Sequence, residues 1–245
     1  MLLLLTPHAS HLTMLGFFWR FTWRLVLLAL IALTLIQFWF FACVWYWSAH
    51  NPDSTAFMRA RLERLREVEP GARLEYRWVP YRSISPYLKR AVVAAEDARF
   101  VQHDGFDWDG IRKAYEKNMR EGEVVAGGST ITQQLAKNLF LSGDRAFWRK
   151  AQETAITVML ELIMDKRRIF ELYLNVIEWG DGVFGAEAAA QHHFGLSAAE
   201  LGPEQAARLA AMTPSPRRYG PGQNTAYLQR RTQTLLARMN AVRVP

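Results

Sequence analysis

The stretch from Leu25 to Trp47 contains no charged residue over 23 positions. As an α-helix, this run would extend about 35 Å, enough to cross the hydrocarbon core of a bilayer with some tilt. The aromatic residues suited to the two membrane interfaces are Trp19, Trp23, Trp45, Tyr46 and Trp47. A cleavable signal peptide would have a shorter apolar region followed by small residues. The sequence therefore predicts an uncleaved transmembrane anchor at 25–47, a short cytoplasmic N-terminus at 1–24 and a folded domain at 48–245.

Charge near the anchor does not decide its orientation. Arg20 and Arg24 precede it, and further arginines follow within about 20 residues, the window in which the positive-inside rule operates. The net charge of +7 and the pI of 9.7 suit nucleic acid, anionic lipid or a phosphate-bearing substrate. No nucleic-acid-binding motif accompanies this charge, so lipid and phosphate are favoured. Cys43 is the only cysteine, which excludes a disulfide or a thiolate metal site within the chain.

The 198 residues after Trp47 are ample for one core, and their periodicity predicts a mainly α domain. Ser85-Pro86 is typical of a helix start, and Asp107 can cap a helix that ends near Gly122. One short strand is expected at 74–78 and a glycine-containing loop at 124–129. Helices are expected at 52–69, 86–96, 107–122, 130–140, 145–164, 166–179, 185–193, 203–213 and 225–241.

The first stretch with chemical content runs from Glu96 to Gly105, EDARFVQHDG. Glu96 and Asp97 come at the end of an apolar helical run, so a glutamate there is half buried by the helix and half exposed to the following loop. A carboxylate in such a setting can act as a general base near neutral pH. On the local pattern alone, an acidic helix end followed by a turn is the more common explanation.

The second stretch runs from Gly127 to Asn138, GGSTITQQLAKN. Its glycines allow close approach of the backbone to a ligand, and Ser129 or Thr130 can cap the following helix, whose N-terminus suits phosphate oxygens. Lys137 lies two turns along that helix. The Gly-Lys-Ser/Thr of a nucleotide-binding P-loop is missing, so a nucleotide is not expected. An ordinary capped helix with a polar face is the alternative.

Further along, Arg149, Lys150 and Glu153 share one helix face, with Glu161 on the same side. A solvated face of salt bridges is the usual explanation of this spacing, and a cationic site for an anionic leaving group is the alternative.

The segment 166–180 carries a core stripe, in which Glu171 and Asn175 are expected to be buried and paired. The alanine-rich segment 182–195 suits close helix packing. Its adjacent His192 and His193 point apart on a helix, which argues against joint metal ligation.

Taken together, these stretches resemble the peptidoglycan glycosyltransferase family (glycosyltransferase family 51), whose domain also occurs in class A penicillin-binding proteins. The resemblance covers about residues 70 to 220. The chain is similar to the monofunctional transglycosylases, in which this domain stands alone behind one anchor. It implies a lysozyme-like, mainly α domain that polymerises lipid II outside the cytoplasmic membrane. The acceptor GlcNAc 4-hydroxyl would attack C1 of the donor MurNAc with inversion, releasing undecaprenyl diphosphate.

The resemblance also implies roles for individual residues. Glu96 matches the general base, and Glu153 matches a second essential glutamate near the donor diphosphate. The cations that would offset charge on the leaving diphosphate are Lys137, Arg149 and Lys150. The residues that would bind or orient sugar and phosphate are Asp97, His103, Ser129, Thr130, Gln133, Gln134 and Asn138. No cofactor is required by the sequence. A divalent cation, Mg²⁺ or Mn²⁺, assists some relatives, but nothing in the sequence places one.

The implied substrate puts the domain on the periplasmic side of the cell inner membrane, with the N-terminus inside. Cell-division proteins and penicillin-binding proteins are candidate partners. The apolar run 139–141, with Phe147 and Trp148, is a candidate for dipping into the membrane beside the lipid tail. His193 stands where the family usually has Tyr, and Phe170 where it usually has Leu; both are expected to be packing positions.

Two other functions remain open at this point. One is a glycan-cleaving, lysozyme-like enzyme, since paired carboxylates also serve that chemistry. The other is an inactive membrane-anchored scaffold of the cell wall.

Overall fold

The computed structural model describes residues 8–122, 127–141 and 147–245, except the side chains of 8–17 and of 147. Residues 1–5, part of the expected loop 124–129 and the Phe147 side chain lie outside the described residues. The chain forms two compact units, Met1–Tyr46 and Trp47–Pro245.

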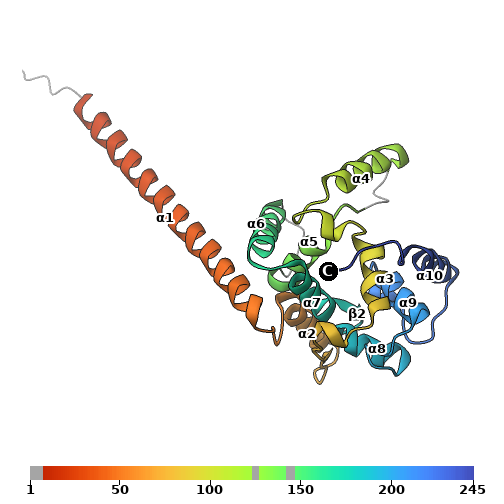
Figure 1. Ribbon diagram of the computed structural model, residues 1–245. Helices are drawn as coiled ribbons and strands as arrows, with labels where there is room; N and C mark the ends of the chain where they lie inside the picture. Colours follow the sequence, from red (N-terminus) through yellow and green to blue (C-terminus); the bar gives the residue numbers. More distant parts are fainter. Residues whose placement is uncertain (1–7, 123–126, 142–146) are drawn as a thin grey trace, which may run out of the picture. The chain divides into compact units, whose positions relative to one another are not determined.

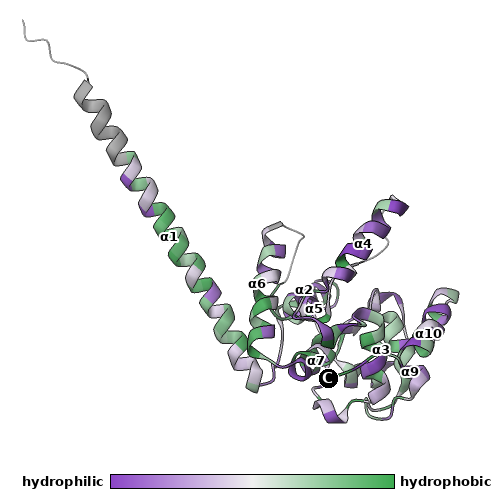
Figure 2. Cartoon of the chain, turned by 45° about the horizontal axis from the view of Figure 1, so that its top comes forward, coloured by the Kyte–Doolittle hydropathy of each residue, from purple (hydrophilic) through white to green (hydrophobic). Residues whose placement is uncertain are grey.

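Helix α1 (His8–Ala49) contains the uncharged run. Its segment Phe18–Ala49 has a mean hydropathy of 2.5 and is long and apolar enough to cross a membrane. Figure 2 shows apolar residues along most of this segment. The helix therefore extends beyond the expected anchor at both ends.

The second unit is mainly α, as predicted (Figure 1). Its helices are α2 (Ala56–Val68), α3 (Pro86–Glu96), α4 (Trp108–Glu121), α5 (Ile131–Phe140), α6 (Phe147–Ile163), α7 (Lys166–Val176), α8 (Ala186–Phe194), α9 (Pro203–Met212) and α10 (Ala226–Arg238). Its strands are β1 (Glu75–Tyr76), β2 (Glu178–Gly180) and β3 (Val183–Phe184), and its short 3₁₀ turns are Tyr81–Ser83, Phe100–Gln102 and Pro216–Arg218.

The helices begin where their capping residues predict. The Ser85 hydroxyl accepts from Tyr87 N at the start of α3. Asp107 accepts from Gly110 N at the start of α4, which ends at Gly122 in the left-handed conformation (φ 71°).

One expectation was wrong. The predicted helix 166–179 ends at Val176, and its last residues form strand β2, which pairs antiparallel with β3. β3 also pairs in parallel with β1, giving the order β1-β3-β2. Gly182, with φ 75°, makes the turn between β2 and β3. Three residues are too few to show a strand period, so the apolar pattern of α7 runs into β2 without a visible break.

The core lies where α5 packs against α6 and α7, and α3 packs against α9. Phe100 and Phe170 are fully buried, with ring centroids 5.6 Å apart. Phe170 is thus a packing position, as expected. The His193 ring lies against Trp179, with Nε2 3.0 Å from its carbonyl oxygen.

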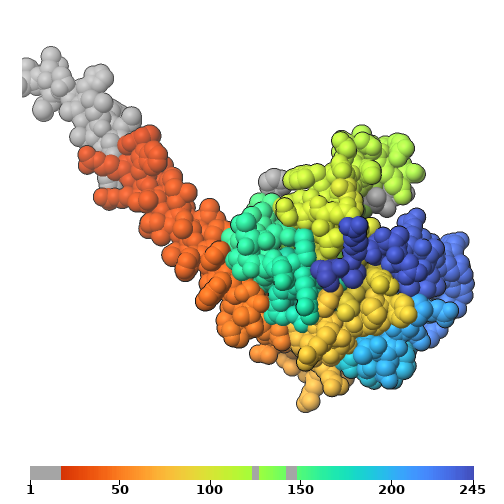
Figure 3. All heavy atoms as spheres, in the orientation of Figure 1, coloured from red at the N-terminus to blue at the C-terminus, as the bar shows by residue number. Residues whose placement is uncertain are grey.

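Helix α4 differs from the others because none of its residues is buried. It projects from the rest of the second unit, in yellow-green in Figure 3. Trp108, Tyr115 and Met119 are all more than 60% exposed on it.

Candidate active site

Glu96 is the last residue of α3, and residues from two other helices hold its carboxylate. Gln134 Nε2, on α5, donates to Oε2 at 2.8 Å. The Thr213 hydroxyl, at the end of α9, donates to Oε1 at 2.5 Å and lies 2.8 Å from the Ala210 carbonyl oxygen. Glu96 is half buried, as predicted.

A buried tyrosine extends this set of hydrogen bonds. The Tyr173 hydroxyl, on α7, donates to Gln134 Oε1 at 2.9 Å. Burial raises the pKa of Tyr173 well above its usual value, and the negative charges of Glu96 and Asp97 raise it further. Tyr173 therefore supports Gln134 as well as filling the core, a role that its place in the apolar stripe did not predict.

Asp97 and His103 have internal partners. Asp97 Oδ2 accepts from the backbone N–H of Ile131, the first residue of α5, at 3.1 Å. His103 Nε2 lies 3.0 Å from Asp97 Oδ1. The structure thus uses these two residues to tie the loop after Glu96 to the start of α5. Their contact with substrate, which the family resemblance implies, stays a prediction.

The start of α5 divides its polar residues into internal and exposed ones. Thr130 and Gln133 form a reciprocal capping box, and the Thr130 hydroxyl donates to the Gly105 carbonyl oxygen at 2.7 Å. Both side chains are buried and maintain the helix start, and their expected contact with substrate stays a prediction. Ser129 is exposed. It lines a cavity of about 180 Å³ together with Glu96 and the backbone of 127–128.

On the Gln134 side of Glu96, two small cavities share Lys137 and Arg217. One, of about 170 Å³, is lined by Gln134, Thr213 and Asn138. The other, of about 210 Å³, is lined by the remaining cations: Arg61, Arg64 and Arg149. The structure thus brings Lys137 and Arg149 together, as predicted, and adds three arginines that the sequence analysis missed.

Glu178 holds two of those arginines. Its buried carboxylate lies 3.3 Å from Arg61 Nε and 3.5 Å from Arg217 Nε. Burial raises the pKa of Glu178, and the two arginines counteract part of that shift. Glu178 was expected only as part of the end of the helix 166–179, so this role was not predicted.

The pair Lys150 and Glu153 has the contact that helical spacing predicts. Lys150 Nζ binds Glu153 Oε1 in an ion pair, with the Glu153 side chain 10% exposed and that of Lys150 54% exposed. Among the described contacts of Glu153, none reaches Glu96. The expected role of Glu153 near the donor diphosphate therefore stays a prediction. Glu161 accepts instead from Lys166 Nζ at 2.8 Å and from the Thr132 hydroxyl at 2.5 Å.

The described residues include no group of three or more His, Cys, Asp or Glu side chains that could hold a divalent cation. Asp107 and Asp109 both pair with Arg99, at 3.3 and 2.9 Å. His192 and His193 turn to different partners, Glu75 and the Trp179 carbonyl. These carboxylates are engaged with cations or hydrogen-bond donors, and the described part of the chain presents no ready metal site.

Glu171 and Asn175 are paired, as predicted. Glu171 accepts from Tyr81 N at 2.7 Å and from Arg168 at 2.7 Å. Asn175 is fully buried and bonds to both the N–H and the carbonyl of Val79 at 3.0 Å.

Comparison with known proteins identifies the family of this chain. The transglycosylase family profile matches residues 62–240. A biosynthetic peptidoglycan transglycosylase of Nitrosospira multiformis is 57% identical over 94% of this chain and 100% of its own length. Proteins of the same name from Laribacter hongkongensis and Azoarcus sp. (strain BH72) are 60% and 62% identical, over 89% and 82% of this chain and 96% and 87% of theirs. A family match over most of the chain, with relatives so similar along their whole length, shows that this chain belongs to the transglycosylase family.

Proposed function

We propose that this chain is a peptidoglycan glycosyltransferase that elongates glycan strands from lipid II at the outer face of the cell inner membrane. The observation that carries the proposal is the position of Glu96. Its carboxylate is held by Gln134 and Thr213, and these two residues line a cavity together with Lys137 and Arg217. Both cations also line a second cavity, where Arg149 joins them. A general base beside a cluster of cations is what transfer of a sugar from a diphosphate requires.

In the proposed reaction, Glu96 takes the proton of the acceptor GlcNAc 4-hydroxyl as its oxygen attacks C1 of the donor MurNAc. The new glycosidic bond forms on the face opposite the leaving group, so the configuration at C1 inverts. The bond from C1 to the diphosphate oxygen breaks, and undecaprenyl diphosphate departs with the growing negative charge. Lys137 and Arg149 offset that charge, which is commonly the largest electrostatic contribution to such a barrier.

Other residues have supporting roles in this proposal. Glu153 lies near the donor diphosphate, where its ion pair holds the ammonium group of Lys150 in place. Ser129 lines a cavity with Glu96, and Asn138 lines one with Gln134 and Thr213, so both can orient sugar or phosphate oxygens. A divalent cation, if used, would act through the diphosphate of the substrate, and no step above depends on one.

The membrane completes the substrate site, because the donor and the acceptor both carry lipid chains. Helix α1 anchors the domain as a single-pass protein, with the catalytic unit on the periplasmic side. One earlier expectation needs correction: Leu139 and Leu141 are buried, so they cannot dip into the membrane. Trp148 is 67% exposed and remains available for that contact. Cell-division proteins and penicillin-binding proteins remain candidate partners.

A glycan-cleaving enzyme would use similar carboxylates but has a neutral leaving group, for which Lys137, Arg149 and Arg217 would serve no purpose. An inactive scaffold would have no need for the hydrogen bonds that orient Glu96. Both alternatives are therefore less well supported than polymerisation.

The decisive experiment compares lipid II polymerisation by the full-length wild type and by Glu96→Gln. The amide cannot accept the proton, so the rate should fall at least about 100-fold while the circular dichroism spectrum stays unchanged. Glu116→Gln, at an exposed position on α4, is the matched control and should polymerise at the wild-type rate. Full activity in Glu96→Gln would remove Glu96 as the base. Release of short fragments from preformed glycan would favour the cleaving enzyme.

A further inference from the structure

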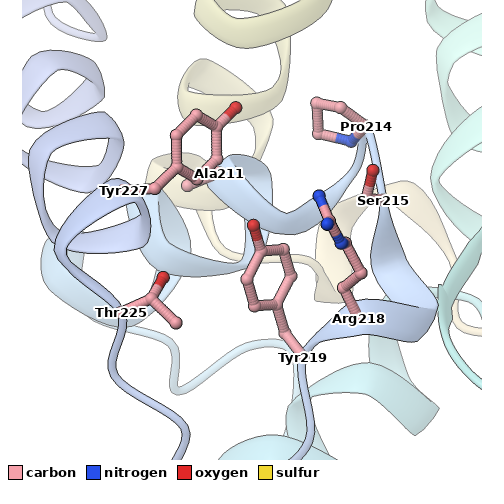
Figure 4. A pocket seen from close by; sticks show the side chains of 7 residues that line it. All are labelled: Ala211, Pro214, Ser215, Arg218, Tyr219, Thr225 and Tyr227. Carbon is pink, nitrogen blue, oxygen red and sulfur yellow. The ribbon is translucent and has the colours of Figure 1, made fainter.

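One cavity of the second unit lies outside the machinery described above. Its volume is about 460 Å³, within the range of about 300–1,000 Å³ typical of small-molecule sites. The end of α9, the 3₁₀ turn Pro216–Arg218 and the start of α10 enclose it (Figure 4). We propose that this cavity binds the acidic stem peptide of a MurNAc residue held at Glu96, an inference that rests on the proposed function.

The cavity has unused polar groups. Tyr219 is only 9% exposed, yet its hydroxyl has no hydrogen-bond partner among the described residues. Figure 4 shows Tyr219 between Arg218 on one side and Thr225 and Tyr227 on the other. Arg218 has no ion pair in the described part of the chain, and no acidic residue is among those described as lining the cavity. A hydroxyl on a largely buried ring and an unpaired cation therefore line this cavity.

The start of α10 adds to the positive potential. Thr225 is the N-cap of α10, a helix of 13 residues, and its side chain accepts from Leu228 N. The remaining first-turn N–H groups have no partner within the helix and favour a negative group. Together with Arg218, they make the cavity selective for carboxylates.

The lining is also suited to a peptide more than to a bare ion. Ala211, Pro214 and the ring of Tyr227 give an apolar wall that can pack against side chains. The hydroxyls of Ser215 and Tyr219 can bond to amides. The chain's own C-terminus does not fill the space, because the Tyr81 hydroxyl holds the Pro245 carbonyl oxygen at 2.5 Å elsewhere.

The cavity adjoins the reaction centre through one short segment. Thr213 bonds to Glu96 and lines the cavity that contains Lys137 and Arg217. The next two residues, Pro214 and Ser215, line the cavity proposed here. The Cα atoms of Thr213 and Ser215 are at most about 7 Å apart along the chain. A peptide attached to a MurNAc bound at Glu96 can therefore reach this space within a few residues. Donor and acceptor both carry such a stem, and the experiment separates them.

The test measures kcat/KM of the full-length protein on lipid II with a complete stem and on lipid II without a stem. The wild type should prefer the complete substrate. Arg218→Gln and Tyr219→Phe should each reduce that preference, Arg218→Gln by about tenfold, the usual effect of losing a charge-assisted hydrogen bond. Both variants should process the stem-less substrate at the wild-type rate.

Two matched variants control for loss of charge and of a hydroxyl elsewhere: Arg238→Gln, three turns along α10, and Tyr87→Phe on α3. Both should keep the wild-type preference. To identify the source, a stem-bearing glycan donor is combined with a stem-less acceptor, and then the reverse. If Arg218→Gln is slower than wild type only when the donor carries the stem, the cavity binds the donor's stem. If it is slower only when the acceptor carries the stem, the cavity binds the acceptor's stem.

A binding measurement makes the result independent of catalysis. Calorimetric titration with free stem pentapeptide should show binding to the wild type and about tenfold weaker binding to Arg218→Gln. If the wild type polymerises lipid II but both variants keep its preference and its peptide affinity, the stem-peptide site is wrong and the proposed function stands. If the wild type binds the peptide but polymerises nothing, the proposed function is wrong and the peptide site stands.

Discussion

Thr213 positions the proposed base from a helix far away in sequence, and its hydroxyl donates to Glu96 Oε1. Thr213→Val keeps the shape and removes the hydrogen bond. Loss of a bond to a charged group costs about 1.5 kcal/mol, so kcat should fall about tenfold, with KM changed less than about twofold. Steady-state polymerisation of lipid II measures both constants.

Thr213→Ser retains the hydroxyl and should restore most of the rate. An equal loss of kcat in the valine and serine variants would mean that packing of the threonine methyl group, and not the hydrogen bond, is what matters.

Glu178 should make stability depend on pH. Burial raises its folded-state pKa above the unfolded value, so folding favours the protonated form. The stability it contributes is complete below the unfolded pKa and is lost as the pH rises through the folded pKa. Glu178→Gln lacks this titration. The melting temperature of the variant minus that of the wild type should therefore be higher at pH 7 than at pH 4.

Thermal unfolding followed by tryptophan fluorescence at the two pH values gives this comparison. The opposite order would show that the ion pairs with Arg61 and Arg217 outweigh the cost of burial.

The two main motifs were recognisable in the sequence because their chemistry lies on contiguous residues. Thr213 was not, because it is 117 positions from Glu96 and no local pattern connects the two. The capping box of Thr130 and Gln133 was not separable in the sequence from a ligand-binding loop, because both use the same residue types. Only burial and bonding partners distinguish these two uses.

At the level of elements, α5 carries Gln134 and Lys137, so its first turn should influence both stability and activity. Thr130→Ala removes the N-cap and the bond to Gly105. The combined cost is about 2 kcal/mol, which corresponds to a melting temperature lower by about 4–8 °C in a protein of this size. Polymerisation at a temperature well below the transition should fall as well.

Differential scanning fluorimetry of the purified protein measures the shift. Thr130→Ser can make both hydrogen bonds and should remain within about 2 °C of wild type. A similar loss of stability in Thr130→Ser would attribute the effect to the methyl group.

Helix starts were predictable because a cap is a local signal, as at Ser85 and Asp107. The strand β2 was not, because three residues become a strand only by pairing with β3. The exposure of α4 could not be foreseen either, since its spacing of Ile111, Tyr115 and Met119 is also that of a buried helix.

For the whole molecule, the division into two units suggests where the anchor can be removed. Trp47 belongs to the catalytic unit, where its ring lies 5.0 Å from that of Phe140 and its carbonyl accepts from Arg168. Removal of 1–46 should therefore leave a folded enzyme that polymerises lipid II in detergent at close to the wild-type rate. In lipid vesicles its rate should fall at least about tenfold, because substrate and enzyme no longer share the membrane.

An unrelated single-pass helix fused before Trp47 should restore the rate in vesicles. Failure of the truncated protein to fold, seen by circular dichroism, would show that α1 is part of the catalytic fold and not only its anchor.

The two hydrogen bonds to Glu96 differ in whether their direction can reverse: one comes from the Gln134 amide and the other from the Thr213 hydroxyl. An ionised Glu96 can only accept, so Gln134 turns its amide nitrogen toward Glu96 and its amide oxygen accepts from the Tyr173 hydroxyl. The Thr213 hydrogen has two acceptors in reach, Glu96 and the Ala210 carbonyl. Once Glu96 has taken a proton, that hydrogen can swing to Ala210 and leave the threonine oxygen to accept. In the proposed reaction, the proton taken from the acceptor sugar therefore binds to Oε1. The Thr213 hydroxyl beside Oε1 can reverse its hydrogen bond, whereas the Gln134 amide beside Oε2 keeps its orientation.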